Sequence, residues 1–165
     1  AAWLAPVAQH CRRLRHVILR DWDIDAAGVI ALANGCAELR YADLTHTWVG
    51  SDAVMALASN CPRLVQLRIG TSDASDDAIA AVLSHARRNL RHLDLTEARA
   101  SGATFAALAK YGSQLRSLEL KNLPRASAAA LIEGLSGCTR VRHLSLAGSD
   151  GVTDDVLRAV ARHCP

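Results

Sequence analysis

The sequence of 165 residues predicts an α/β solenoid, in which short parallel strands form a concave sheet and helices cover its convex back. Three observations predict this fold. A pattern of the form L-x-x-L-x-L, with apolar substitutes, recurs six times at intervals of 25 or 26 residues. A stretch with apolar residues at helical spacing follows each copy. Half of the residues are apolar but only 4% are aromatic, which suits a core of uniform aliphatic layers.

The six copies of the pattern are the expected strands, because the L-x-L end of each alternates apolar and polar residues. They are "LRHVIL" at 14–19, "LRYADL" at 39–44, "LVQLRI" at 64–69, "LRHLDL" at 90–95, "LRSLEL" at 115–120 and "VRHLSL" at 141–146. Equal spacing over the whole chain is a stronger signal than any single copy, and it places the strands side by side in order.

A helix is expected after each strand and a short polar loop, with pairs such as Val29 and Leu32 facing the core. A small oxygen-bearing residue stands where the first helical N–H groups need acceptors, and we expect these residues to be N-caps: Asp25, Ser51, Asp76, Ser101, Ser127 and Thr153. Gly35, Asn60 and Gly137 are expected just past helix ends as C-terminal caps.

One strand and one helix cannot bury both of their apolar faces, whereas stacked copies can. We therefore expect one array over residues 1–165, of about six units with partial units at both ends, cut from a longer protein. The closing Cys164-Pro165 matches Cys61-Pro62, which leads into a strand. At the other end Pro6 is tolerable only in the first turn of a helix, and Trp3 is expected to pack at the start of the array.

The last unit, "VRHLSLAGSDGVTDDVLRAVARHCP", resembles the leucine-rich-repeat family, and within it the cysteine-containing class of F-box proteins. The resemblance implies a right-handed, horseshoe-shaped solenoid that serves as a protein–protein interaction scaffold, as in the substrate-receptor repeats of ubiquitin ligases. It covers the repeats alone, and no F-box segment lies in the chain. Family members often carry Asn or Cys three residues after the strand, where this chain has other residues, so less regular loops are expected: Trp22, Thr47, Ser72, Ala98, Leu123 and Ser149.

Charge and hydropathy exclude two classes of partner. The net charge of +3 comes from 19 basic and 16 acidic residues spread through the chain, which gives no footprint for nucleic acid. The longest uncharged apolar run, at 26–37, is too short to span a bilayer, so membrane insertion is not expected. The first eleven residues lack the basic start of a signal peptide.

The five cysteines share one position, three residues before a strand's first apolar residue, and we expect all of them to be buried, free and structural: Cys11, Cys36, Cys61, Cys138 and Cys164. Arg87 and Gly112 fill that position in the other units. Reduced thiols indicate an intracellular compartment. Because the sequence shows no converging metal ligands, no phosphate-cradling loop and no catalytic triad, we expect no metal, no cofactor and no enzymatic activity.

Two polar sets stay open to two interpretations. An arginine follows the first apolar residue of five strands, and this row either binds phosphate or an acidic peptide, or covers apolar surface at the sheet edge: Arg15, Arg40, Arg91, Arg116 and Arg142. The histidines His16, His92 and His143 share the concave face but lie roughly 10 Å or more apart, too far for one metal.

We expect the partner-binding surface on the concave face and its rim, where mixed charges and aromatic residues suit a protein partner. The candidates are His16, Arg20, Tyr41, Asp43, Arg68, His92, Asp94, Glu119, Lys121 and His143 on the strands, with Trp22 and Trp48 in adjacent loops. The alternatives are that the charges neutralise one another across strands, and that the two tryptophans pack on each other or on loop backbone. The expected function is a protein-interaction scaffold, either a ubiquitin-ligase substrate receptor or a structural subunit of a large stable assembly.

Overall fold

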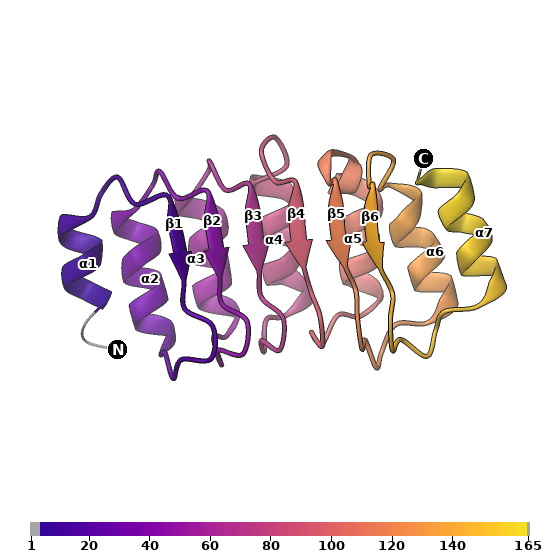
Figure 1. Ribbon diagram of the computed structural model, residues 1–165, viewed down its shortest axis with the longest axis horizontal. Coiled ribbons are helices and arrows are strands. Elements are labelled where there is room, and N and C mark those ends of the chain that lie inside the picture. The colour runs from indigo at the N-terminus through magenta and orange to yellow at the C-terminus, as the bar shows by residue number, and fades with distance from the viewer. Residues whose placement is uncertain (1–3, 165) are drawn as a thin grey trace.

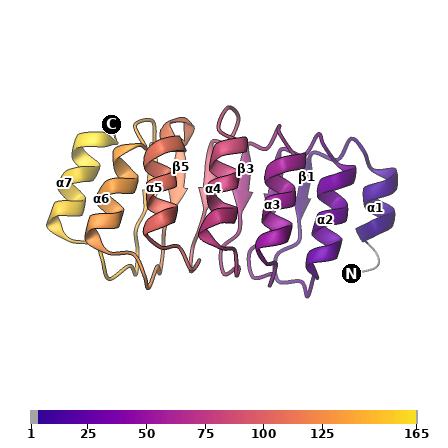
Figure 2. The same ribbon diagram turned by 180° about the vertical axis from the view of Figure 1, so that it is seen from behind.

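The computed structural model describes residues 4–164 as an open, six-stranded parallel sheet with a row of helices behind it (Figures 1 and 2). The strands are β1 (His16–Ile18), β2 (Tyr41–Asp43), β3 (Gln66–Arg68), β4 (His92–Asp94), β5 (Ser117–Glu119) and β6 (His143–Ser145). The helices are α1 (Leu4–His10), α2 (Ala26–Gly35), α3 (Ser51–Asn60), α4 (Asp76–His85), α5 (Gly102–Tyr111), the 3-10 turn η1 (Gly112–Gln114), α6 (Ala128–Ser136) and α7 (Asp154–His163). Trp3 and Pro165, for which the sequence makes predictions, lie outside the described residues.

The strands lie side by side in chain order, each pairing in parallel with the strand of the next repeat. The register matches equivalent repeat positions, for example Val17 with Ala42 and Leu67 with Leu93. Backbone pairing continues past the three-residue strands, since Asp21 N–H donates to the Thr45 carbonyl oxygen at 3.1 Å. The solenoid predicted from the repeat spacing is confirmed.

The core lies between the sheet and the helices. The central residue of each inner strand points inward and is buried, as Leu67, Leu93 and Leu118 show. The helices contribute their inner faces, including Phe105 on α5, which is fully buried. Leu144 on β6 is only half-buried, because the last strand has a neighbour on one side. In α1, Pro6 occupies the first turn, where no intrahelical acceptor is needed, so the short helix tolerates it.

Two of the expected N-caps are wrong by one residue. Asp25, Ser101 and Ser127 cap their helices, each accepting a backbone N–H in the first turn. Ser51 and Asp76 are instead the first helical residues, and Gly50 and Ser75 take the cap positions. Thr153 holds the N-cap position of α7 without a side-chain cap bond.

Ser51 and Asp76 instead tie successive repeats together. Ser51 Oγ accepts the Ser75 N–H at 2.9 Å. Asp76 accepts the Ser101 N–H at 2.9 Å, and the hydroxyls of Ser101 and Thr104 also donate to its carboxylate. These bonds join the start of α3 to the start of α4, and the start of α4 to the start of α5.

The expected C-terminal caps need a similar correction. Gly137 is the C-cap of α6, but Gly35 and Asn60 are the last helical residues of α2 and α3, and the cap positions belong to Cys36 and Cys61. Gly35 serves close helix packing, because a Cβ there would lie 2.2 Å from the Ala8 carbonyl oxygen on α1. A Cβ on Gly137 would lie 2.1 Å from the Ala109 carbonyl oxygen on α5.

The strand-to-helix loops are regular, which contradicts the expectation drawn from the missing Asn or Cys. One residue in each of these loops adopts a left-handed conformation: Asp21, His46, Thr71, Glu97, Asn122 and Gly148. Backbone bonds close the turns, as when Thr47 N–H donates to the Leu44 carbonyl oxygen. Ser149 performs the expected tethering role, since its Oγ donates to the Leu120 carbonyl oxygen at 2.9 Å and accepts the Leu123 N–H at 3.1 Å.

The cysteines stack in two groups, Cys11 with Cys36 and Cys61, and Cys138 with Cys164, and all five are free thiols. Cys36, Cys61 and Cys138 are buried as expected, and Cys61 Sγ donates to the Cys36 carbonyl oxygen at 3.8 Å. Burial raises the pKa of Cys61 and of Cys138 to about 12. The expectation of burial is wrong for Cys11, which is exposed, and Cys164 is half-buried, because both lie in the outermost layers of the described array.

Candidate protein-binding face

The outward residues of the strands form two registered rows across the sheet, which we call the sheet face. The first row is His16, Tyr41, Gln66, His92, Ser117 and His143, and the second is Ile18, Asp43, Arg68, Asp94, Glu119 and Ser145. Because successive side chains of a strand point to opposite faces, the first and third residues of each three-residue strand lie on the outer side of the sheet. The first row is polar and aromatic, and the second carries four consecutive charged residues between Ile18 and Ser145.

The carboxylates of Asp43 and Asp94 in the second row are not displayed to solvent, which corrects the expectation that they are available to a partner. Their residues are 0% and 5% exposed. Asp43 accepts the Thr45 N–H at 3.1 Å and the Thr45 hydroxyl at 2.7 Å, and Arg20 covers it at 2.6 Å. The period of two along a strand determines the side of the sheet, but long arginine side chains from neighbouring strands cover the short aspartates.

Arg68 lies at the centre of this charged row. Its Nη2 lies 3.0 Å from Asp94 Oδ2, and it approaches Asp43 and Glu119, each at 3.9 Å. Lys121 Nζ pairs with Glu119 at 2.6 Å. The charges therefore neutralise one another across strands, which is the alternative that the sequence left open.

The pKa of Asp43 is below its ordinary value. Burial alone would raise it, but the hydroxyl and N–H of Thr45 and the charge of Arg20 stabilise the carboxylate and outweigh that effect. The carboxylate is thus held ionised inside the sheet face. Thr45, a hydrogen-bond partner of the Asp43 carboxylate, is absent from the predicted site residues, because that prediction rested on charged and aromatic side chains. Its place two residues after Asp43 is the feature of the sequence that could have identified it.

A shallow recess lies along the first row, and its lining is polar with one basic residue. A cavity of about 270 Å³ is lined by His16, Arg40, Tyr41, Val65, Gln66 and His92. The rings of His16 and Tyr41 lie 6.1 Å apart at 44°. The pKa of His92 is lowered by burial and by the nearby charges of Arg116 and His143. Imidazole, phenol, amide and guanidinium groups therefore border the recess, and they can form hydrogen bonds with a peptide backbone.

Large apolar side chains are exposed at the N-terminal end of the face. Trp48 is 77% exposed and Trp22 is 56% exposed, both in strand-to-helix loops as expected. Ile18 on β1, which was not among the predicted site residues, is 59% exposed. These three residues and the recess involve the first four strands.

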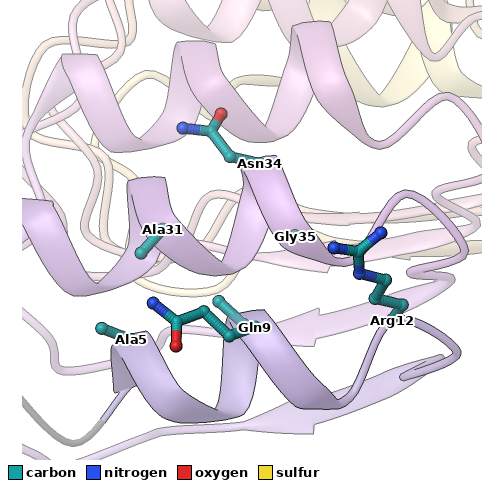
Figure 3. A pocket seen from close by; sticks show the side chains of 7 residues that line it. Ala5, Gln9, Arg12, Ala31, Asn34 and Gly35 are labelled. Atoms are coloured by element: carbon teal, nitrogen blue, oxygen red, sulfur yellow. The ribbon is translucent and has the colours of Figure 1, made fainter.

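A second cavity of about 450 Å³ lies on the helical side between α1 and α2 (Figure 3). Ala5, Gln9, Ala31 and Asn34 border it, and Arg12 closes one end, as Figure 3 shows. Short side chains on the facing helices leave this space. No three His, Cys, Asp or Glu side chains within residues 4–164 converge as metal ligands. Among the described helices, none has the length and apolar character needed to cross a bilayer.

Comparison with known proteins supports the architecture. No protein-family model matches the chain, and no curated protein matches it in sequence. The structure of the Rad7 and Elc1 complex in yeast matches 97% of this chain with a TM-score of 0.73 and 14% identity, and the match spans 42% of that chain.

Two further solved structures are similar. The C-terminal domain of tropomodulin from Caenorhabditis elegans matches 84% of this chain and 91% of its own, with a TM-score of 0.63 and 13% identity. An internalin from Listeria monocytogenes matches 95% of this chain and 45% of its own, with a TM-score of 0.64 and 21% identity. At these identities the likeness concerns the fold, and it supports a leucine-rich-repeat type of α/β solenoid.

Proposed function

We propose that this chain is a non-catalytic protein-interaction scaffold that binds its partner through the N-terminal half of the sheet face and the adjoining loops. The observation that carries this proposal is the exposure of Trp48, Trp22 and Ile18 in the first two repeats, whose strands also carry His16 and Tyr41 of the recess. Exposed tryptophans are the residue type that most often dominates the energy of protein interfaces. The hydrogen-bonding recess on the same strands, which Arg40 also lines, supplies the polar part of such a surface.

The burial of two aspartates changes which of the predicted residues can contact a partner. Asp43 and Asp94 are occupied by Arg20 and Arg68, so their role is to hold the face rigid. Contact with a partner falls to the exposed or half-exposed members of the set in the N-terminal half: His16, Arg20, Trp22, Tyr41, Trp48, Arg68 and His92. Glu119, Lys121 and His143 belong to β5, its end and β6, and they extend the face beyond this site.

The resemblance to the repeats of F-box proteins leads to a finer proposal, that the partner is a substrate of a ubiquitin ligase. The fold neighbour from yeast, whose structure was solved as the Rad7 and Elc1 complex, is compatible with a repeat array that works inside a protein complex. Co-purification of a ligase adaptor with the full-length protein tests this version. A stable complex that lacks such an adaptor would favour a structural subunit.

The test of the scaffold proposal is quantitative affinity capture from source cells with wild type, the double variant Trp22→Ala with Trp48→Ala, and Leu157→Ala. Leu157 is a matched control, because it is a 55% exposed apolar residue on α7, away from the sheet face. We expect one set of proteins to bind wild type and Leu157→Ala and to be depleted about tenfold or more by the double variant. Equal recovery by all three would contradict the placement of the site.

A further inference from the structure

A basic pocket lies on the edge of the solenoid where helices end and strands begin. Its volume is about 280 Å³, and it is lined by Arg87, Arg88, Lys110, Tyr111, Ser113 and Gln114. The lining supplies three cations, two hydroxyl groups and one amide, and it includes no carboxylate. The pocket lies between the α4–β4 turn and the end of α5, at the opposite end of the strands from the tryptophan loops.

The extra residue in one repeat builds the first wall of this pocket. The sequence places Arg87 in the cysteine position, and the structure corrects this: Ala86 is the C-cap of α4 and is 1% exposed, as Cys61 is the C-cap of α3. The 26-residue spacing therefore lengthens the turn and leaves both Arg87 and Arg88 exposed. This turn extends beyond its neighbours in Figure 1.

The lengthened turn is held in place by hydrogen bonds. Asn89 N–H and Leu90 N–H both donate to the Ala86 carbonyl oxygen, at 2.9 and 2.8 Å. The Asn89 side-chain amide donates to the Pro62 carbonyl oxygen at 2.8 Å, which anchors the turn to the preceding repeat. The arginines thus project from a fixed backbone.

The following repeat builds the second wall. Its turn contains η1, which carries Ser113 and Gln114 into the pocket. A Cβ at Gly112 would lie 2.9 Å from Cys138 Sγ, so this position accepts glycine and lets the neighbouring cysteine fill the core. Lys110 Nζ lies 5.1 Å from the centre of the Tyr111 ring, a cation–π contact that holds the ammonium group beside the pocket.

The positive charge of the pocket is not neutralised from within the protein. No ion pair within residues 4–164 involves Arg87, Arg88 or Lys110. Across the helix-to-strand turns of the array the single acidic residue is Glu38, and it is already paired with Arg63. Basic residues that are spread along the sequence are thus gathered by the fold on one edge, where like charges repel until an anion binds.

We propose that this pocket is a binding site for a phosphate monoester dianion. Guanidinium groups donate paired hydrogen bonds to phosphate oxygens, and an ammonium group adds a point charge. A phosphate monoester carries up to two negative charges and three acceptor oxygens, which suits three cations and two hydroxyl donors better than a single carboxylate does. The site is separate from the sheet face, so it stands whether or not the scaffold proposal holds.

The test is a titration of the isotope-labelled protein followed by amide chemical shifts, at constant ionic strength maintained with chloride. The probes are inorganic phosphate, O-phosphoserine, and one peptide in three forms, with phosphoserine, serine or glutamate at its centre. We expect saturable shifts confined to the amides of residues 86–90 and 110–115 with the phosphorylated probes. Tighter binding of the phosphopeptide than of O-phosphoserine identifies a protein segment as the source, and equal binding identifies a small phosphorylated molecule.

Two matched variants complete the test. Arg87→Gln with Arg88→Gln is expected to weaken phosphate binding by about tenfold to a hundredfold, because each lost charge-assisted hydrogen bond contributes up to about tenfold. Arg12→Gln with Arg13→Gln removes the same charge from an exposed pair in the α1–β1 turn and is expected to leave binding at the pocket unchanged. Shifts that do not saturate, equal binding of the glutamate peptide, or equal weakening by both variants would overturn the proposal. Superimposable amide spectra of the free variants verify that each is folded.

Discussion

The guanidinium of Arg68 on β3 donates from Nε to Oδ2 of Asp94 on β4 at 3.0 Å, across the boundary between two repeats. The same arginine lies within 3.9 Å of Asp43 on β2. One side chain therefore links three consecutive strands above the backbone ladder, and it covers two carboxylates that the fold has largely removed from water.

Replacing Arg68 with methionine is expected to destabilise the protein by about 1–3 kcal/mol, since Asp94 loses a charged donor and stays buried. Methionine keeps the aliphatic stem, which separates the loss of charge from the loss of packing. Lys121→Met is the control: its partner Glu119 is partly exposed, and surface pairs contribute at most about 1 kcal/mol. The free energy of unfolding in urea measures both. An Arg68 variant as stable as the Lys121 variant would mean that the buried carboxylates need no cation.

Asp76→Asn is expected to lower stability at neutral pH and to flatten its dependence on acid. Burial raises the pKa of Asp76, but hydrogen bonds from Ser101 and Thr104 outweigh it and hold the pKa below the ordinary value. A carboxyl whose pKa is lower in the folded state stabilises the protein above its unfolded pKa of about 3.9, and this stability is lost as the pH falls through the folded value.

Urea unfolding at about pH 6 and about pH 3 measures the effect. Wild type is expected to lose stability between the two, and Asp76→Asn to lose less. The neighbour Asp77 provides the control, because it is exposed on the same turn of α4. If Asp77→Asn flattened the profile equally, the bonds that tie α4 to α5 would not be the cause.

Gly137→Ala is expected to destabilise the protein by about 1–3 kcal/mol, although alanine favours helical backbone more than glycine does. The added Cβ would lie 2.1 Å from the Ala109 carbonyl oxygen, so α5 and α6 would have to separate. Gly102→Ala is the matched control, since nothing lies within 4 Å of a Cβ there, and its stability is expected to stay equal or rise slightly. Thermal unfolding compares the two variants. Similar midpoint temperatures would show that α5 and α6 separate at little cost in stability.

Thiol labelling of the native protein is expected to modify Cys11 first, Cys164 more slowly, and Cys36, Cys61 and Cys138 only on unfolding. The reactive species is the thiolate, and burial raises the pKa of Cys61 and Cys138 to about 12, which suppresses it. Mass spectrometry after brief exposure to iodoacetamide locates the label. Cys11→Ser should abolish the fast phase, and rapid labelling of Cys61 would indicate that the core opens readily.

Much of the fold could be predicted because one physical requirement repeats. Leu67, Leu93 and Leu118 recur at intervals of 25 or 26 residues, and stacked layers are the arrangement that buries them all. The candidate face was predictable only in outline. Alternation places Asp43 on the outer side of the sheet, but its burial depends on Arg20, Tyr41, Thr45 and Arg68, which reach it from three strands or their ends.

The N-cap predictions that were wrong by one residue also have a physical explanation. Ser51 and Asp76 carry the side chains of a helix cap, and only the backbone decides that the residue before each holds that place. In the same way, a 26-residue interval does not reveal where the extra residue lies. The structure places it after Ala86, and the basic pocket depends on that location.

The strand order has a consequence for mechanics. Each strand pairs only with the strands of adjoining repeats, so the array has no bond that closes its first layer onto its last. Tension applied at one end can peel away a single layer while the rest keeps its shape, and the molecule can bend as a spring does by small changes at every junction. Ion pairs such as that between Arg68 and Asp94 stiffen particular junctions between repeats.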